Sequence, residues 1–240
     1  MAQALSVHKL VRDYGPLRAV AGISFEIMPG EIFGLIGPNG SGKTTTLRIV
    51  ATLLQPTSGE VTVFGHNVVT EAGAVRRLIS YLPEEAGAYK NLSGLEYLRF
   101  MATFYSHDTT SRDRLVDQGV ELAGLGPRIN DKVSTYSKGM ARKLLLARCL
   151  MMAPKLAILD EPTSGLDVEN SLAVRATIRR LARAGTTVLL SSHNMLEVEF
   201  LSDRVALIRQ GRLIEAGTPD ELKQRHSSRN LEEVFMKVAG

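Results

Sequence analysis

Residues 37–44 read Gly-Pro-Asn-Gly-Ser-Gly-Lys-Thr, which fits the pattern G-x-x-x-x-G-K-[ST]. This pattern is typical of a phosphate-binding loop, in which the glycines let successive backbone N–H groups point into one concavity. Lys43 adds a fixed positive charge for the β- and γ-phosphate oxygens, and the Thr44 hydroxyl is a ligand for Mg²⁺. A glycine-rich turn without a ligand is the alternative.

The segments on either side of this loop favour phosphate binding. Residues 32–36 are a short apolar run such as a buried strand has. After the loop, apolar residues recur at i, i+3, i+4 and i+7 and predict one face of a helix: Leu47, Val50, Ala51 and Leu54. A helix that begins at the loop directs its dipole and free N–H groups at the phosphates. The residues expected to contact the nucleotide here are Gly37, Pro38, Asn39, Gly40, Ser41, Gly42, Lys43, Thr44 and Thr45.

The composition is that of an ordinary globular protein. The chain has 240 residues, of which 44% are hydrophobic and 22% charged, enough for one large domain or two lobes. It has neither an apolar run near the ~20 residues of a membrane span nor a signal-peptide core, so we expect a cytoplasmic protein. The single Cys149 lies in an apolar helical stretch, which favours an inert core thiol over a reactive one.

The net charge of +4 allows two interpretations. A basic protein can bind nucleic acid or an anionic membrane surface. The 29 basic residues are scattered among 25 acidic ones, however, with no long basic tract. A mixed, solvated surface is therefore favoured, and no nucleic-acid partner is expected.

The order of the predicted elements indicates an α/β fold. The first 30 residues alternate apolar and polar, which predicts antiparallel strands with one buried face. Strand character returns at three later segments with helices between them, which predicts a mainly parallel sheet: 156–160, 187–191 and 204–208. The helical pattern from about Asn91 to Ala153 indicates an inserted lobe. The expected domains are a nucleotide-binding core with an antiparallel β lobe (1–85 and 155–225), a helical lobe (86–154) and a helical tail (226–240).

Two polar motifs follow predicted strands. The apolar run 156–159 ends in Asp160 and Glu161; beside a phosphate-binding loop these acids favour Mg²⁺ binding by Asp160 and activation of the attacking water by Glu161, rather than a surface turn. His193 ends the strand at 187–191, on the sheet edge where α/β proteins bind ligands. A lone histidine is more often structural, but this position favours a hydrogen bond to the γ-phosphate or the attacking water. The expected catalytic residues are Glu161, His193 and Lys43.

With these motifs in this order, essentially the whole chain resembles the nucleotide-binding subunit of an ABC transporter. Residues 133–140 stand where that family has its signature loop. The resemblance implies that Ser137 and Gly139 bind the γ-phosphate held by the opposite subunit of a head-to-tail dimer. The usual Leu-Ser-Gly-Gly-Gln is altered at Tyr136, Lys138 and Met140. Ser137 still lies at a predicted helix N-terminus, which suits an anion, and Lys138 either adds charge there or is solvated.

The resemblance assigns two further residues. Tyr14 stands where the family stacks an aromatic ring on adenine, and an ordinary turn tyrosine is the alternative. Glu84 replaces the glutamine of the family's Q-loop. Both side chains supply an oxygen, so the expected metal ligands are Thr44, Glu84 and Asp160, with an altered rate or coupling from the added charge. Glu84, the altered signature and the segment 231–235 look like the exporter-type subclass.

The resemblance therefore implies an ATP-binding subunit that hydrolyses MgATP as a homodimer. Hydrolysis would drive transport by a separate transmembrane permease, with export as the expected direction. The permease would bind beside residues 85–105 and hold the protein at the inner face of the membrane. A soluble ABC-type ATPase acting on ribosomes or nucleic acid is the second interpretation, which the lack of a tandem cassette or a long insertion disfavours. A P-loop kinase or GTPase is the third, and it leaves residues 137–140, Asp167 and His193 without a role.

Overall fold

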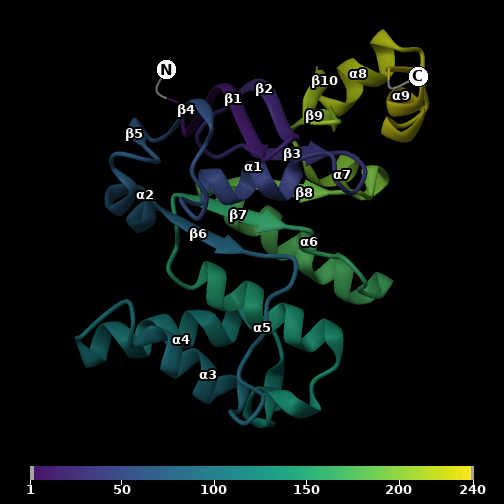
Figure 1. Cartoon of the computed structure of the whole chain (residues 1–240). Coiled ribbons are helices and arrows are strands. Elements are labelled where there is room, and N and C mark those ends of the chain that lie inside the picture. Colours follow the sequence, from purple (N-terminus) through teal and green to yellow (C-terminus); the bar gives the residue numbers. More distant parts are fainter. Residues whose placement is uncertain (1–2, 239–240) are drawn as a thin grey trace.

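The computed structural model describes residues 3–238, which form two sheets with helices around them (Figure 1). Residues 1–2 and 239–240, which the expected domain division includes, lie outside the described residues. The smaller sheet is antiparallel in the order β2-β1-β4-β5. Its strands are β1 (Leu5–Tyr14), β2 (Leu17–Ile27), β4 (Ser58–Val63) and β5 (His66–Asn67).

The larger sheet has the order β10-β9-β3-β8-β7-β6. Its strands are β3 (Ile32–Ile36), β6 (Ile79–Leu82), β7 (Leu156–Asp160), β8 (Thr187–Ser192), β9 (Arg204–Arg209) and β10 (Arg212–Gly217). All neighbouring pairs in this sheet are parallel except β9 and β10. The predicted α/β fold class, with a mainly parallel sheet and an N-terminal antiparallel sheet, is confirmed.

Helices cover the larger sheet and fill the chain between β6 and β7. That insertion holds α3 (Gly94–Ala102), α4 (Thr109–Ala123), two short 3₁₀ turns and α5 (Lys138–Leu150), which gather on one side of the sheets (Figure 1). The remaining helices are α1 (Lys43–Val50), α2 (Ala72–Leu78), α6 (Val168–Arg183), α7 (Met195–Leu201), α8 (Pro219–Arg225) and α9 (Leu231–Val238). Among residues 3–238, no helix has both the length and the apolar character that a membrane crossing requires.

Strands β3, β7 and β8 are buried along their whole length. Successive side chains point to opposite faces of a sheet, so each strand serves two cores. Phe33 and Leu35 pack with the antiparallel sheet and α1, whereas Ile32 and Ile36 pack with the helices on the other face. Burial on both faces explains why these strands are continuous apolar runs in the sequence.

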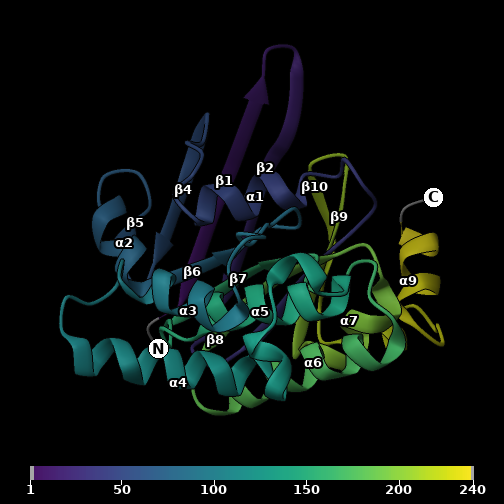
Figure 2. The same ribbon diagram turned by 90° about the horizontal axis from the view of Figure 1, so that it is seen from below.

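Helix α1 is shorter than its apolar pattern predicts. It ends at Val50, Ala51 is its C-cap, and Leu54 lies beyond its end. At the other end of the chain, Asn230 Oδ1 accepts the Glu233 N–H at 2.9 Å and α9 begins at Leu231. The β1–β2 hairpin extends furthest from the body of the protein, and α9 lies at the edge of the molecule (Figure 2).

The state of Cys149 gives a test of this packing. The thiol is buried and donates to Ser80 Oγ at 3.2 Å, and burial raises the pKa of Cys149. At about pH 8, a free thiol is partly ionised and reacts with disulfide reagents. We expect the folded protein to react with such a reagent at least about tenfold more slowly than the denatured protein, because the thiolate is the nucleophile. Equal rates, with Cys149→Ala as the unreactive control, would contradict this packing.

Candidate functional site

The loop at residues 37–42 requires glycine at two points of close backbone contact. Gly42 has φ of +107°, and a Cβ there would lie 2.5 Å from the Ala19 carbonyl oxygen. A Cβ on Gly37 would lie 2.1 Å from the Ile208 carbonyl oxygen. Gly42 is also the N-cap of α1, with no side-chain cap and no acid in the first helical turn. The N–H groups that begin α1 are therefore open to an anion.

Lys43 is buried at the start of α1. Its Nζ donates to the carbonyl oxygens of Gly37 at 2.8 Å and Pro38 at 3.2 Å, and lies 3.8 Å from Glu161 Oε1. Burial lowers the pKa of Lys43, and the carboxylates of Glu161, Asp160 and Glu84 oppose this shift. The loop thus folds back around its own lysine, which faces the acids at the end of β7.

Asp160 and Thr44 come together although 116 residues separate them in the chain. Thr44 Oγ1 donates to Asp160 Oδ1 at 3.2 Å, and Ser191 donates to the same oxygen. The Tyr81 hydroxyl donates to Asp160 Oδ2 at 3.4 Å; burial and then the Asp160 charge raise the pKa of Tyr81. A carboxylate beside a hydroxyl is the kind of oxygen donor set that Mg²⁺ binds, so these residues fit the expected metal.

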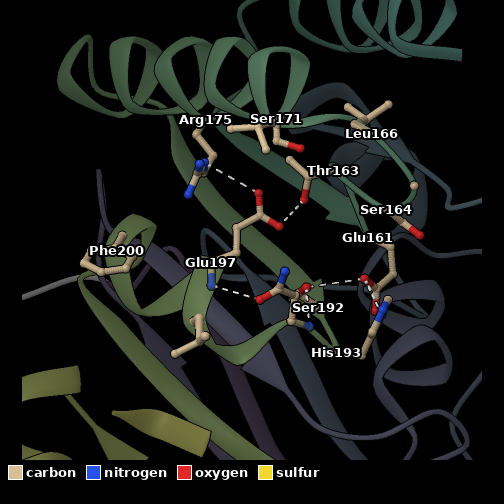
Figure 3. A pocket seen from close by; sticks show the side chains of 14 residues that line it. Glu161, Thr163, Ser164, Leu166, Ser171, Arg175, Ser192, His193, Glu197 and Phe200 are labelled. Atoms are coloured by element: carbon tan, nitrogen blue, oxygen red, sulfur yellow. Dashed lines mark hydrogen bonds and ion pairs between the residues drawn. The ribbon is translucent and has the colours of Figure 1, made fainter. Parts of the chain in front are cut away.

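Glu161 has an unusual backbone and one unpaired oxygen. Its φ is +48°, in the left-handed region that non-glycine residues adopt only occasionally. Its Oε2 accepts from Ser192 Oγ at 3.3 Å and lies 2.9 Å from His193 Nδ1 (Figure 3). Its Oε1 is buried without a hydrogen-bond partner. Because buried polar atoms are nearly always paired, this oxygen points to a ligand or water as its partner.

Glu161 and His193 line a cavity of about 410 Å³ between α6 and α7 (Figure 3). Glu197 of α7 crosses this cavity: its Oε2 accepts from Thr163 Oγ1 at 2.6 Å, and its Oε1 lies 3.6 Å from Arg175 Nε. These contacts join the segment that follows Glu161 to the helix that follows His193. His193 itself is half-exposed.

Ser137 and Gly139 have no described contact with Lys43, Asp160 or Glu161. Ser137 is the N-cap of α5, and its Oγ accepts the Met140 N–H at 3.2 Å. A Cβ on Gly139 would lie 2.5 Å from the side chain of Asn170, so glycine lets α5 approach the start of α6. The Lys138 ammonium lies directly over Gly165.

Tyr14 and Glu84 are also peripheral to the cluster. Tyr14 is partly exposed at the end of β1, and the Arg12 guanidinium carbon lies 4.7 Å from its ring centroid. Arg12 therefore covers one face of the Tyr14 ring. The Glu84 carbonyl accepts from Arg142, and its carboxylate acts on Lys43 through charge alone.

Three residues of the site are not among those predicted from the sequence: Arg142, Thr163 and Glu197. A signal for Arg142 exists in the sequence. Arg142 lies on the same face of α5 as three buried apolar residues, which follow it at i+3, i+4 and i+7: Leu145, Leu146 and Cys149. A charged residue on a buried helix face needs a partner, whereas Thr163 and Glu197 carry no comparable pattern.

Comparisons with known proteins identify the family of this chain. Residues 20–164 match the family model described as ABC transporter. The chain is 37% identical to the linearmycin resistance ATP-binding protein LnrL of Bacillus subtilis (strain 168), over 92% of this chain and 71% of the relative. It is 39% identical to the daunorubicin/doxorubicin resistance ATP-binding protein DrrA of Streptomyces peucetius, over 92% of this chain and 67% of the relative.

A solved structure of an ATP-binding subunit of an ABC transporter superposes with a TM-score of 0.87 and 27% identity, over 99% of this chain and 100% of that chain. A family model that covers more than half of the chain and relatives above 30% identity together show the family. The chain belongs to the ABC transporter family, as an ATP-binding and ATP-hydrolysing subunit of the exporter type.

Proposed function

We propose that two copies of this chain hydrolyse MgATP at two shared sites, and that this drives export through a separate transmembrane subunit at the inner face of the membrane. The unpaired, buried Glu161 Oε1, 3.8 Å from Lys43 Nζ, is the observation that carries the proposal. A carboxylate oxygen with no hydrogen bond from the protein, beside a phosphate-binding lysine, is suited to accept a proton from water.

Each residue of the cluster has a role in this reaction. Lys43 and the N–H groups of the 37–45 segment bind the phosphates and offset their charge. Glu161 Oε1 orients the attacking water and takes its proton, while His193 and Ser192 fix the other carboxylate oxygen. Thr44, Asp160 and Glu84 would hold Mg²⁺, which when bound neutralises charge on the phosphate oxygens. The ring of Tyr14 would stack on adenine.

Two features support a site shared between copies. Ser137 and Gly139 lie at the N-terminus of α5, where a helix start suits an anion. Their described contacts are with Met140 and Asn170 and not with Lys43 or Glu161 of the same chain, so a nucleotide of a second copy can be their ligand. The chain also carries both halves of a site, so a head-to-tail pair would have two complete sites. The exporter assignment follows the names of LnrL and DrrA, which are drug-resistance proteins.

A row of exposed aromatic rings supports a permease-binding face at residues 85–105. Tyr89 and Phe100 stack edge to face at 5.5 Å between centroids, and Phe100 and Phe104 do so at 5.1 Å. Phe104 also lines a groove of about 640 Å³ with three arginines: Arg76, Arg77 and Arg148. An apolar segment with acidic side chains, contributed by the transmembrane subunit, fits this groove, because exposed apolar patches mark interaction sites.

Glu161→Gln tests the proposed base. The amide keeps the shape of the side chain but does not accept the proton, so turnover should fall by about 10²–10⁴-fold. ATP affinity, measured by calorimetry, should be retained, and ATP should lock a dimer that size-exclusion chromatography detects. Turnover at the wild-type rate would show that Glu161 is not the base.

The shared site is tested by mixing two inactive variants. Lys43→Ala removes the charge that binds the phosphates, and Ser137→Arg blocks closure onto the partner's nucleotide. A mixed dimer has one site with both residues intact and one with both lesions, so ATPase activity should partly return on mixing. Absence of activity in mixed dimers, confirmed by differential tags, would contradict the shared site. A monomeric enzyme would show no rescue at any ratio.

Phe104→Asp tests the permease face. We expect co-purification with the transmembrane subunit to fall at least about tenfold, because a charge replaces an apolar contact, while basal ATPase activity is kept. The matched control is Leu17→Asp, since Leu17 is 64% exposed and Phe104 is 67% exposed. Equal losses in both variants would reject the assigned face. A wild-type ATPase that binds no membrane protein would favour the soluble ABC ATPase.

A further inference from the structure

The side chain of Arg142 joins three parts of the molecule. Arg142 lies in α5 one turn after Ser137, and it is only 8% exposed. Its Nε donates to the Pro162 carbonyl at 2.9 Å. Its Nη1 donates to the carbonyls of the 83–84 turn at 3.0 and 3.1 Å, and its Nη2 donates to the carbonyls of Asp160 and Glu161, both at 2.8 Å.

These bonds use the full capacity of the guanidinium. Arginine has five N–H donors in a planar fork, and five bonds are formed, each to a backbone carbonyl. Burial lowers the pKa of Arg142, and the nearby Asp160 carboxylate opposes the shift most strongly. A buried charge with all donors paired to carbonyls does not bind a ligand; it fixes the backbone around it.

The backbone that Arg142 fixes includes that of Glu161. The Glu161 N–H donates to the Ser191 carbonyl at 3.1 Å, and the Glu161 carbonyl accepts from Arg142. The residue between these two bonds has the left-handed φ of +48°. Such a conformation is strained for a non-glycine residue and needs support from the surrounding structure. β8 therefore holds the N–H side of Glu161. Arg142 holds its carbonyl side, together with the Ser164 N–H, which donates to the same oxygen at 3.2 Å.

We propose that Arg142 is a positioning residue for hydrolysis, which holds the Glu161 backbone so that Oε1 faces Lys43 and which links that position to α5 and to the turn at residues 83–84. This inference rests on the proposed role of Glu161 as base. A shift of α5, which begins at Ser137, or of the 83–84 turn reaches Glu161 through one rigid side chain. Arg142 touches no reacting atom itself.

Arg142→Lys tests this role, since lysine keeps the charge but has no planar fork that reaches three backbone segments. We expect kcat for ATP hydrolysis to fall about tenfold to a hundredfold, because small displacements of a catalytic group cost that much. ATP affinity should change less than about twofold, because the phosphate-binding loop is untouched. Both quantities are measured where circular dichroism shows the variant fully folded.

Arg180→Lys is the matched control. Arg180 of α6 also reaches the inserted helices, through Glu121 of α4 at 3.2 Å, but it lies away from Glu161. We expect its kcat to match that of the wild type. If Arg142→Lys has the kcat of Arg180→Lys, or loses ATP affinity as much as kcat, the positioning role is rejected.

A double-mutant cycle shows whether Arg142 acts through Glu161. Adding Arg142→Lys to Glu161→Gln should lower the residual single-turnover rate less than about twofold, because the group that Arg142 positions is already missing. If the fold loss in rate of the double variant equals the product of the two single-variant losses, the proposal is overturned. If Glu161→Gln alone keeps wild-type turnover, the proposed base is wrong; if it is inactive while Arg142→Lys is fully active, only the inference about Arg142 fails.

Discussion

The parallel alignment of β3, β8 and β7 is the constraint on which the site depends. Ile36 pairs with Ser192, and Asp160 pairs with Ser191, so the three strands end level with one another. The phosphate-binding loop follows β3, the two acids close β7, and His193 follows β8. Two backbone hydrogen bonds continue this pairing past the ends of β3 and β7: the Gly37 N–H donates to the Ser192 carbonyl, and the Glu161 N–H donates to the Ser191 carbonyl. A slip of one residue in either pairing would turn the acids away from Lys43.

Four buried charges meet where these strands end, and they balance. Lys43 and Arg142 are the cations, and Asp160 and Glu161 are the anions; all four are less than a tenth exposed. A buried charge is tolerated when it is paired and hydrogen-bonded, and removal of one partner leaves the others uncompensated. The four charges therefore compensate one another, and Glu161 Oε1 is the carboxylate oxygen among them without a hydrogen bond from the described residues.

The sequence predicts the elements whose signals are local. Apolar runs identify β3, β7 and β8, and glycine spacing identifies the phosphate-binding loop, because each pattern reflects burial or backbone freedom at its own position. The left-handed φ of Glu161 and the five bonds of Arg142 are not local. They depend on carbonyls 18 to 59 residues away in the chain, which no short pattern encodes. The end of α1 at Val50 is a backbone feature that apolar spacing does not report: Thr52 has a left-handed φ of +62°, and the N–H groups of Leu53 and Leu54 donate back to the Arg48 carbonyl.

The altered signature loop has a structural explanation at Lys138. A lysine replaces the usual first glycine of the family motif, and its ammonium lies over Gly165, in the segment that follows Glu161 and Thr163. Gly165 has φ of +67° and no side chain, so the lysine passes where a Cβ would clash. The charge of Lys138 is therefore directed at the 163–166 segment of its own chain. The loop that would face the partner's nucleotide therefore also contacts the segment after Glu161 of its own chain, through Lys138. Arg142, on the next turn of α5, contacts the same segment at Pro162.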